Sequence, residues 1–126
     1  MNVLIDSYGW IEYFTGGPLA SKYAKYIETA NSSDYISPSI VIFEVYKRIK
    51  MIKGETAALK AIPYIIEHTK IIPIDKKEAL NSAEASIRLK LAMADSIIKS
   101  IADENNATVV TSDKHFKNME NVIFIE

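Results

Sequence analysis

Residues 2–14 read NVLIDSYGWIEYF, and this opening segment indicates how the fold begins. An apolar run ends abruptly at Asp6, and an amphipathic segment follows at once. The pattern predicts a buried strand over residues 3–6 and a short helix over residues 8–14. Asp6 has two explanations at this point: it caps the helix by accepting a hydrogen bond from a free backbone N–H, or it serves a site at the end of the strand.

The composition is that of an ordinary globular protein. The 126 residues are 48% hydrophobic and 25% charged, which suits a single domain, expected over residues 1–126. Cysteine is absent, so disulfides and thiolate metal ligands are excluded. The first apolar run is too short for a signal peptide, and no run approaches the roughly 18 residues of a membrane span. We therefore expect a cytoplasmic protein with no membrane association.

The charge is nearly balanced, with 15 basic and 16 acidic residues and a net charge of −1. Nucleic-acid binders often carry a basic patch, and the total charge gives no sign of one. A balanced total can nevertheless hide acids that gather in one pocket while the cations lie elsewhere. The charge therefore does not exclude a polyanionic substrate.

Short apolar segments alternate with helical ones along the rest of the chain. We expect strands over residues 3–6, 35–36, 71–74, 108–111 and 122–125. We expect helices over residues 8–14, 19–30, 38–53, 55–68, 79–91 and 95–104, with a helical turn over 114–119. Ser37 is expected to cap the third helix, and Pro63 to bend or divide the fourth. The alternation predicts an α/β fold with a mainly parallel central sheet flanked by helices on both faces, the first strand central and the third at an edge.

Four acids occupy positions near the expected carboxyl ends of the strands, where ligands bind in such folds. Asp6 follows the first strand, Asp113 follows the fourth, and Asp95 begins the helix that leads into the fourth strand. Glu44 is the lone acid in the apolar-rich stretch 38–46. Taken together, these positions predict that the four carboxylates converge on one side of the sheet.

Each of these acids also has an ordinary alternative role. Asp95 and Asp113 are candidate helix caps, and Glu44 is placed to pair with Lys47 or Arg48, three and four residues further along the helix.

A cluster of carboxylates requires compensation. Two carboxylates about 4 Å apart repel by about 4 kcal/mol at an effective dielectric constant of 20. The cluster would either raise its own pKa values or bind cations. All-oxygen ligands suit Mg²⁺ or Mn²⁺, and such an ion can activate water for phosphodiester hydrolysis.

Four segments in this order, VLIDSYGWIEYF, SIVIFEVYKRI, LAMADSIIKSIADENNATVVTSDKHF and NVIFIE, resemble the PIN-domain nucleases, especially VapC-like toxins of toxin–antitoxin pairs. The resemblance implies that the catalytic, metal-binding acids are Asp6, Glu44, Asp95 and Asp113. It implies a single PIN-like domain that hydrolyses RNA with a water molecule activated by Mg²⁺ or Mn²⁺. It also implies an antitoxin protein as partner and a homodimer.

Further residues near the four acids are candidates for supporting roles. Thr111 or Ser112 matches the hydroxyl-bearing position before the last acid and would orient metal or water. The candidate phosphate contacts are Lys47, Arg48, Lys114 and Lys117. The candidate base-stacking aromatics, which helical spacing assigns as readily to the core, are Trp10, Tyr13, Phe14, Tyr23 and Tyr26.

Four other titratable residues are given lesser roles. His115 is a candidate acid–base group that a metal-activated water does not require, and His68 is expected at the surface. Asp75 is expected to cap a helix, and Asp103 is a candidate cleft residue.

Two rival functions fit parts of the pattern. A non-catalytic PIN-like module would bind RNA or protein, but binding alone does not need a costly cluster of acids. A phosphoacceptor receiver domain would have paired acids after its first strand and a lysine after its fifth; this chain has a single acid after the first strand. Phosphate-binding glycine fingerprints are absent from the sequence.

Overall fold

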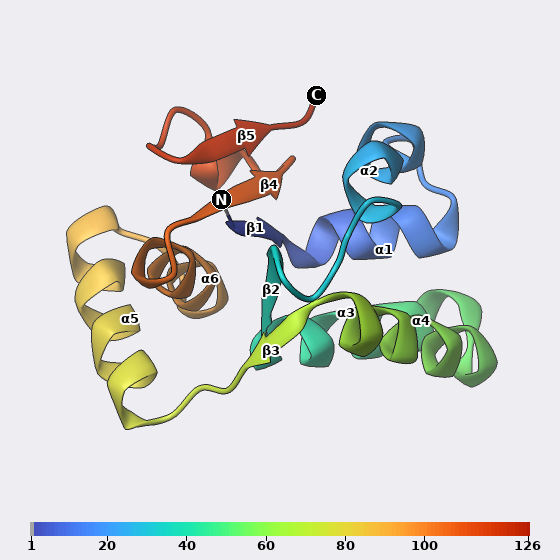
Figure 1. Ribbon diagram of the computed structural model, residues 1–126, viewed down its shortest axis with the longest axis horizontal. Helices are drawn as coiled ribbons and strands as arrows, with labels where there is room; N and C mark the ends of the chain where they lie inside the picture. Colours follow the sequence, from blue (N-terminus) through green and yellow to red (C-terminus); the bar gives the residue numbers. More distant parts are fainter. Residues whose placement is uncertain (1) are drawn as a thin grey trace.

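The computed structural model describes residues 2–126, and the sheet within this range has five parallel strands in the order β3-β2-β1-β4-β5 (Figure 1). The strands are β1 (Asn2–Ile5), β2 (Tyr35–Pro38), β3 (Lys70–Ile72), β4 (Ala107–Thr111) and β5 (Val122–Phe124). The first strand is central and the third lies at an edge, which confirms the expected topology.

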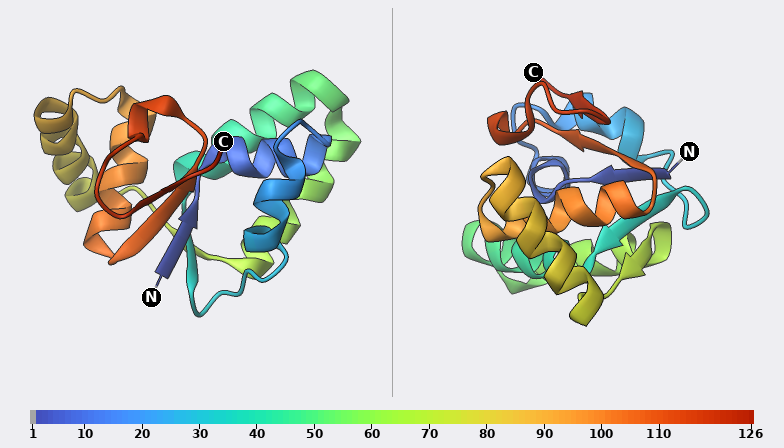
Figure 2. Two further views of the ribbon diagram at one scale, coloured as in Figure 1. Left: turned by 90° about the horizontal axis from the view of Figure 1, so that it is seen from above. Right: turned by 90° about the vertical axis from the view of Figure 1, so that its left-hand side faces the viewer.

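Helices cover both faces of this sheet. They are α1 (Ser7–Thr15), α2 (Ala20–Ile27), α3 (Ser39–Lys53), α4 (Glu55–His68), α5 (Lys76–Leu89) and α6 (Met93–Glu104), with a 3₁₀ turn η1 (Lys114–Phe116). Helices α5 and α6 lie on one face, and α1 to α4 lie on the other (Figures 1 and 2). The α/β class and the two covered faces are as the alternation predicts.

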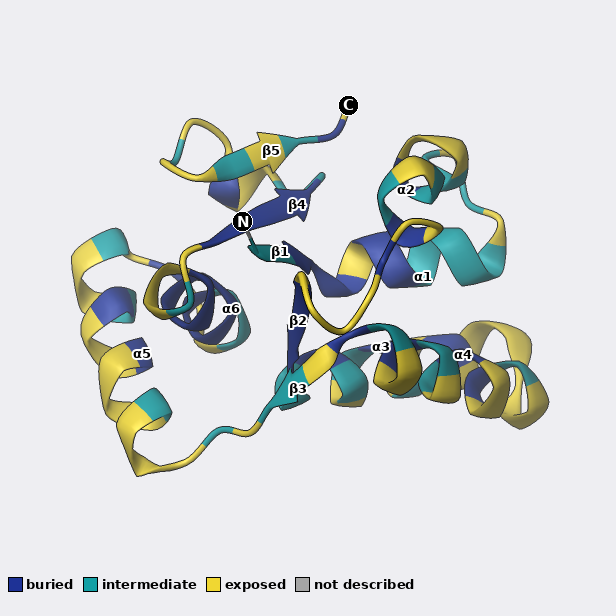
Figure 3. Ribbon diagram, in the orientation of Figure 1, coloured by how far each residue is buried: buried dark blue, intermediate teal, exposed yellow. Residues whose placement is uncertain are grey.

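The central strands are apolar in consecutive positions because both of their faces are covered. Leu4, Ile5, Val109 and Val110 are each at most 1% exposed. Figure 3 shows burial concentrated in β1, β2, β4 and α6. These strands form a rigid base, and the segments that leave their carboxyl ends carry the acids singled out above.

The start of α3 differs from the expectation. Ser37 and Pro38 belong to β2, and α3 begins at Ser39 without a side-chain cap. The pairing of Ser37 with Ile71 and of Pro38 with Ile72 in β3 extends the strand to these residues. Proline is tolerated there because it is the last residue of the strand and no ladder bond requires its missing N–H.

Pro63 neither divides nor ends its helix. Helix α4 runs unbroken from Glu55 to His68 with Pro63 inside it. Proline removes one backbone donor, and the carbonyl it leaves free is that of Leu59. Both Leu59 and Pro63 are exposed, so water can satisfy that carbonyl. The expected division into two short helices was therefore wrong, while the expected bend at Pro63 stays a prediction.

Local residues define one helix start and one helix end, and the cap predicted at Asp75 is confirmed. Asp75 caps α5 in a reciprocal capping box with Glu78, which starts this helix at Lys76, three residues before the expected position. Asn106, just after α6, has a left-handed backbone with φ of 52°, a conformation that asparagine tolerates.

Candidate active site

Asp6 lies at the end of β1 and begins α1. Its carboxylate accepts a hydrogen bond from the Gly9 backbone N–H at 3.0 Å and another from the Thr111 hydroxyl at 2.6 Å. Burial raises the pKa of the Asp6 carboxyl to about 7; the two hydrogen bonds oppose this rise, and the charge of Asp113 adds to it. The capping role is therefore real, but the residue also belongs to a buried polar site.

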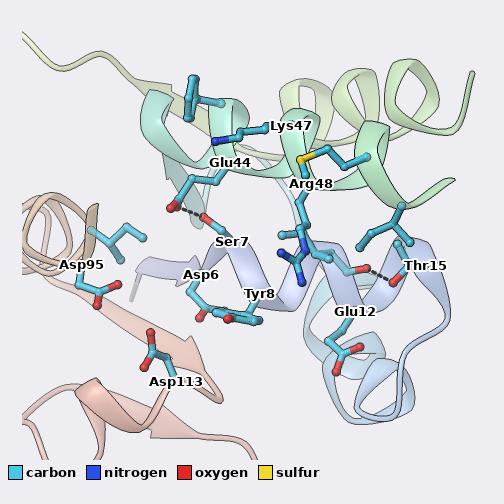
Figure 4. A pocket seen from close by; sticks show the side chains of 15 residues that line it. Asp6, Ser7, Tyr8, Glu12, Thr15, Glu44, Lys47, Arg48, Asp95 and Asp113 are labelled. Carbon is cyan, nitrogen blue, oxygen red and sulfur yellow. Dashed lines mark hydrogen bonds between the residues drawn. The ribbon is translucent and has the colours of Figure 1, made fainter. Parts of the chain in front are cut away.

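A cleft of about 570 Å³ opens at the carboxyl end of the sheet. Its lining includes an acid from each of four segments: Asp6, Glu44, Asp95 and Asp113 (Figure 4). The parallel sheet explains this meeting, since β1 and β4 are neighbours and their ends lie at the same edge. The predicted convergence of the four acids on one side of the sheet is thus what the fold produces.

Asp95, Asp113 and His115 form the tightest group in the cleft region. The Nδ1 atom of His115 lies 3.2 Å from Asp95 Oδ2 and 3.2 Å from Asp113 Oδ1. One ligand atom from each of the three residues lies within 4.8 Å of the other two. Burial raises the pKa of Asp95, the charge of Asp113 adds to this rise, and His115 opposes it. This group has the spacing of a cation site.

The capping alternatives for these two acids have different outcomes. Helix α6 begins at Met93 with Ala92 as its cap residue, so Asp95 lies in the first turn and is not the cap. Asp113 does cap the turn η1, because its carboxylate accepts a hydrogen bond from the His115 backbone N–H at 2.9 Å. The same bond fixes the backbone of His115 close to the acids. His115 is therefore closer to the site than its sequence position alone suggested.

Glu44 is held by a serine that the sequence analysis missed. The Ser7 hydroxyl donates a hydrogen bond to Glu44 Oε1 at 2.5 Å. Within residues 2–126, neither Lys47 nor Arg48 forms an ion pair with Glu44, so the alternative role of Glu44 as a helical pairing partner is not what the structure shows. Ser7 directly follows Asp6, and the start of α1 thus contributes to the placement of two of the four acids.

The hydroxyl groups after β4 connect the acids to one another. Thr111 donates to Asp6 and accepts a hydrogen bond from the Asp113 backbone N–H at 2.9 Å. Ser112 accepts one from the Tyr23 hydroxyl at 2.8 Å. Tyr23 also lies 3.4 Å from Asp6 Oδ1, and burial raises the pKa of its phenol, which stays neutral.

The four candidate cations do not all lie in the cleft. Lys47 and Arg48 line it. Lys114 and Lys117 are not among its lining residues, and Lys117 lies 3.8 Å from Glu126. Asp103, which was a candidate cleft residue, instead bonds to Lys99 at 2.5 Å in a second hollow at the opposite end of the sheet. The position of Lys47 and Arg48 on α3 gives the cleft a cationic side opposite the end of β4 (Figure 4).

The aromatic residues in the cleft are not the ones that helical spacing suggested. Trp10 and Tyr23 are buried in the core. The exposed aromatic side chains that line the cleft are Tyr8 and Phe43, at 57% and 60% exposure. Each stands next to a site segment in the sequence, Tyr8 two residues after Asp6 and Phe43 directly before Glu44, and this adjacency is the signal that could have found them.

The remaining aromatic candidates pack away from the four acids. Tyr13 and Phe14 surround the ring of Tyr64. His68, expected at the surface, stacks on the same ring with centroids 3.9 Å apart, and its Nδ1 lies 2.7 Å from the Tyr64 carbonyl oxygen. Tyr13 and Phe14 thus contact α4 from α1, whereas the stacking of His68 on Tyr64 is within α4.

Among the helices of residues 2–126, none combines the length and the apolar character that crossing a bilayer requires.

Comparison with known proteins identifies the family to which this fold belongs. The PIN domain family matches residues 3–122, which is nearly the whole chain. The chain therefore belongs to the PIN domain family, as the resemblance in the sequence implied. No curated protein matches the sequence significantly.

Solved structures with the same fold include toxins of toxin–antitoxin systems. The chain superposes with a TM-score of 0.78 on a toxin–antitoxin complex from Klebsiella pneumoniae, at 22% identity over 97% of this chain and 96% of that one. It superposes with a TM-score of 0.76 on VapC20 of Mycobacterium tuberculosis, a sarcin–ricin loop cleaving toxin, at 9% identity over 92% of each chain. A third similar structure is VapBC2 of Rickettsia felis bound to a promoter DNA fragment, with a TM-score of 0.72 and 19% identity over 98% and 97%. At these identities the likeness concerns the fold.

Proposed function

We propose that this protein is a metal-dependent endoribonuclease that hydrolyses RNA phosphodiesters, and that it is the toxin of a toxin–antitoxin pair. The observation that carries the proposal is the cleft that Asp6, Glu44, Asp95 and Asp113 all line. Membership of the PIN domain family and the likeness of fold to VapC toxins support it.

The donor set fits a hard divalent cation. Carboxylate oxygens are the preferred ligands of Mg²⁺ and Mn²⁺, and the imidazole of His115 lies beside two of them. The residues that would hold the ion are Asp6, Glu44, Asp95 and Asp113, with His115 at the rim. A bound ion would supply an activated water molecule and neutralise charge on the phosphate. Burial is the main cause of the raised pKa values of Asp6 and Asp95, and the charge of Asp113 adds to both; a bound cation would lower these pKa values.

The side chains around the acids would bind and orient the RNA. Lys47 and Arg48 line the cleft and would contact phosphates on either side of the scissile bond. Tyr8 and Phe43 expose their rings in the same cleft, where unpaired bases can stack. Thr111 would keep Asp6 oriented through its hydrogen bond, and Ser112 supports the same turn. These contacts favour a single-stranded or looped substrate, because stacking needs bases released from a duplex.

The partner assignments rest on the fold neighbours and on exposed apolar surface. Solved neighbours are complexes of toxins with antitoxins, and we infer an antitoxin for this chain. Met51 and Ile52, at 72% and 50% exposure, extend the cleft away from the acids and offer apolar surface to such a partner. We infer a homodimer in the cytoplasm as well. Leu80 and Ile87 on α5, at 69% and 76% exposure, form a separate apolar face that a second copy would cover.

The alternative is a PIN-like module that binds RNA or protein without cleaving. It is less favoured, because a binding role gives no reason to hold four carboxylates in one cleft at an electrostatic cost. This alternative and the nuclease differ in one measurable respect, which is the cleavage of RNA in the presence of a divalent ion.

The test compares two aspartates that both cap helices. Asp6→Asn keeps the capping geometry but removes the charge, and Asp75→Asn makes the same change at the start of α5, far from the cleft. RNA cleavage is measured for both variants with Mg²⁺ and with Mn²⁺, and circular dichroism checks the fold. We expect Asp6→Asn to lose at least about 100-fold in cleavage rate, as the loss of a metal-binding group does, and Asp75→Asn to match the wild type. A folded Asp6→Asn variant that cleaves at the wild-type rate would refute the mechanism.

A further inference from the structure

Tyr23 is a buried residue from outside the acid cluster that contacts it directly. It belongs to α2, an element that contributes none of the four acids, and it is 0% exposed. Its hydroxyl donates to Ser112 Oγ at 2.8 Å and lies 3.4 Å from Asp6 Oδ1. One phenol oxygen thus touches the segments that leave β1 and β4.

The ring of Tyr23 reaches this position because Gly9 makes room for it. A Cβ atom at Gly9 would lie 2.5 Å from Tyr23 Cε1 and 2.6 Å from Ile5 Cγ2, which no folded chain tolerates without movement. The same glycine donates its backbone N–H to Asp6. Gly9 therefore serves the contact between α1 and Tyr23 as well as the cap at Asp6.

Tyr23 and Thr111 form two parallel hydroxyl bridges between the strand ends. Thr111 connects Asp6 to the Asp113 backbone, and Tyr23 connects Asp6 to Ser112, the residue in between. The charges of Asp6 and Asp113 repel each other, and this repulsion tends to separate the two segments. The Tyr23 bridge comes from a separate, well-packed helix. It therefore resists that separation better than the Thr111 bridge, which moves with the segment that leaves β4.

We propose that Tyr23 is a positioning residue of the metal-binding site: its hydroxyl, through Ser112 and Asp6, holds the ends of β1 and β4 at the separation that the divalent ion requires. The inference rests on the function proposed above, since it expects loss of the Tyr23 hydroxyl to weaken metal binding and to slow RNA cleavage. In metalloproteins generally, a hydrogen bond that orients a side chain bound to the metal strengthens metal binding.

The experiment compares Tyr23→Phe with a matched control, Tyr35→Phe. Both tyrosines are buried, but the hydroxyl of Tyr35 lies near Thr29 at 3.3 Å, away from the acids. For each protein, the Mn²⁺ affinity is measured by calorimetry. The kcat and KM for cleavage of single-stranded RNA are measured at saturating Mn²⁺, and the Tm is measured as well. We expect Tyr23→Phe to bind Mn²⁺ about tenfold more weakly and to turn over more slowly with an unchanged KM. Tyr35→Phe should keep both values, while the Tm of the two variants falls to a similar extent.

A double-mutant cycle with Ser112→Ala separates positioning from a general loss of stability. If Tyr23 acts through Ser112, Ser112→Ala alone weakens Mn²⁺ binding by a similar factor, and adding Tyr23→Phe to it has little further effect. Wild-type Mn²⁺ affinity and kcat in Tyr23→Phe would overturn the inference and leave the proposed function intact. Fully additive losses, or equal losses in Tyr35→Phe, would also overturn it. A wild-type protein that neither binds Mn²⁺ nor cleaves RNA would overturn the proposed function, and this inference with it.

Discussion

The start of α1 and the start of α5 have the same local chemistry in different surroundings. Asp6 and Asp75 both end an extended segment and cap the helix that follows. Asp75 is exposed and completes its cap with Glu78, and the nearest buried residue of its helix, Ser82, lies seven positions further along the chain. Asp6 is 2% exposed and shares its second oxygen with Thr111. The comparison teaches that a cap is a local property, whereas a reactive site is created by what the rest of the fold places around the cap.

The largest expected effect concerns the pH dependence of stability in the metal-free protein. A pKa of about 7 for Asp6 in the folded chain, against an ordinary value of 3.8, corresponds to about 4 kcal/mol. The folded state holds this proton more tightly than the unfolded state, so the free energy of unfolding falls as pH rises from about 4 to about 7. Urea denaturation of the wild type and of Asp6→Asn across this range measures the effect.

The Asp6→Asn variant lacks the carboxyl group that titrates, so its free energy of unfolding should fall less between about pH 4 and about pH 7. Asp75→Asn should follow the wild type closely, because it leaves Asp6 in place. If the free energy of unfolding changed with pH in the same way in the wild type and in Asp6→Asn, the pKa of Asp6 would not be raised in the folded protein.

The second expected effect is a steric clash at Gly9, in the first turn of α1. Gly9→Ala adds a Cβ atom that overlaps Tyr23 and Ile5, and we expect a loss of about 3 kcal/mol, at the upper end for overpacking. The control is Gly16→Ala, where nothing lies within 4 Å but the backbone has φ of 69°. It should cost only about 1 kcal/mol, since strain at the left-handed position is its sole penalty. Equal losses in the two variants would contradict the close packing of Tyr23 against Gly9.

The third effect is stabilisation by metal. An ion that binds only the folded chain adds about 2.7 kcal/mol when its concentration is 100 times the dissociation constant. Mn²⁺ should therefore raise the Tm of the wild type by several degrees, and it should raise the Tm of Asp75→Asn equally. For Asp6→Asn the rise should shrink or vanish. Differential scanning calorimetry with and without Mn²⁺ decides this, and no rise in the wild type would count against the proposed cation site.

The smallest effect belongs to the exposed cap. Asp75→Ala removes the side-chain acceptor of the capping box, which costs about 1 kcal/mol. Thermal unfolding should show this loss, while RNA cleavage stays at the wild-type rate because α5 starts far from the cleft. A reduced cleavage rate in a folded Asp75→Ala variant would break the distinction between the two caps.

The sequence by itself determined the class of the fold and the identity of four of the five acids that line the cleft; the fifth, Glu12, was not predicted. Apolar runs that alternate with helical stripes fix an α/β fold, because strands buried on both faces need apolar residues in succession. Asp6 was visible because it directly follows such a run, and Asp113 because it comes two residues after the strand expected over residues 108–111. The cap at Asp75 was visible because its capping contacts are made within its own helix, with Lys76 and Glu78. Each of these signals is local, because it is carried by residues that lie within a few positions of one another along the chain.

Only the tertiary structure decided how the acids are held. Ser7 reaches Glu44 across 37 residues of sequence, and Tyr23 reaches Ser112 across 89. The extension of β2 through Pro38 likewise depends on its pairing with β3, and the continuity of α4 on which way Pro63 faces. Hydrogen bonds and packing between distant segments leave no fixed spacing in a sequence, since they depend on how whole helices and strands come together in space.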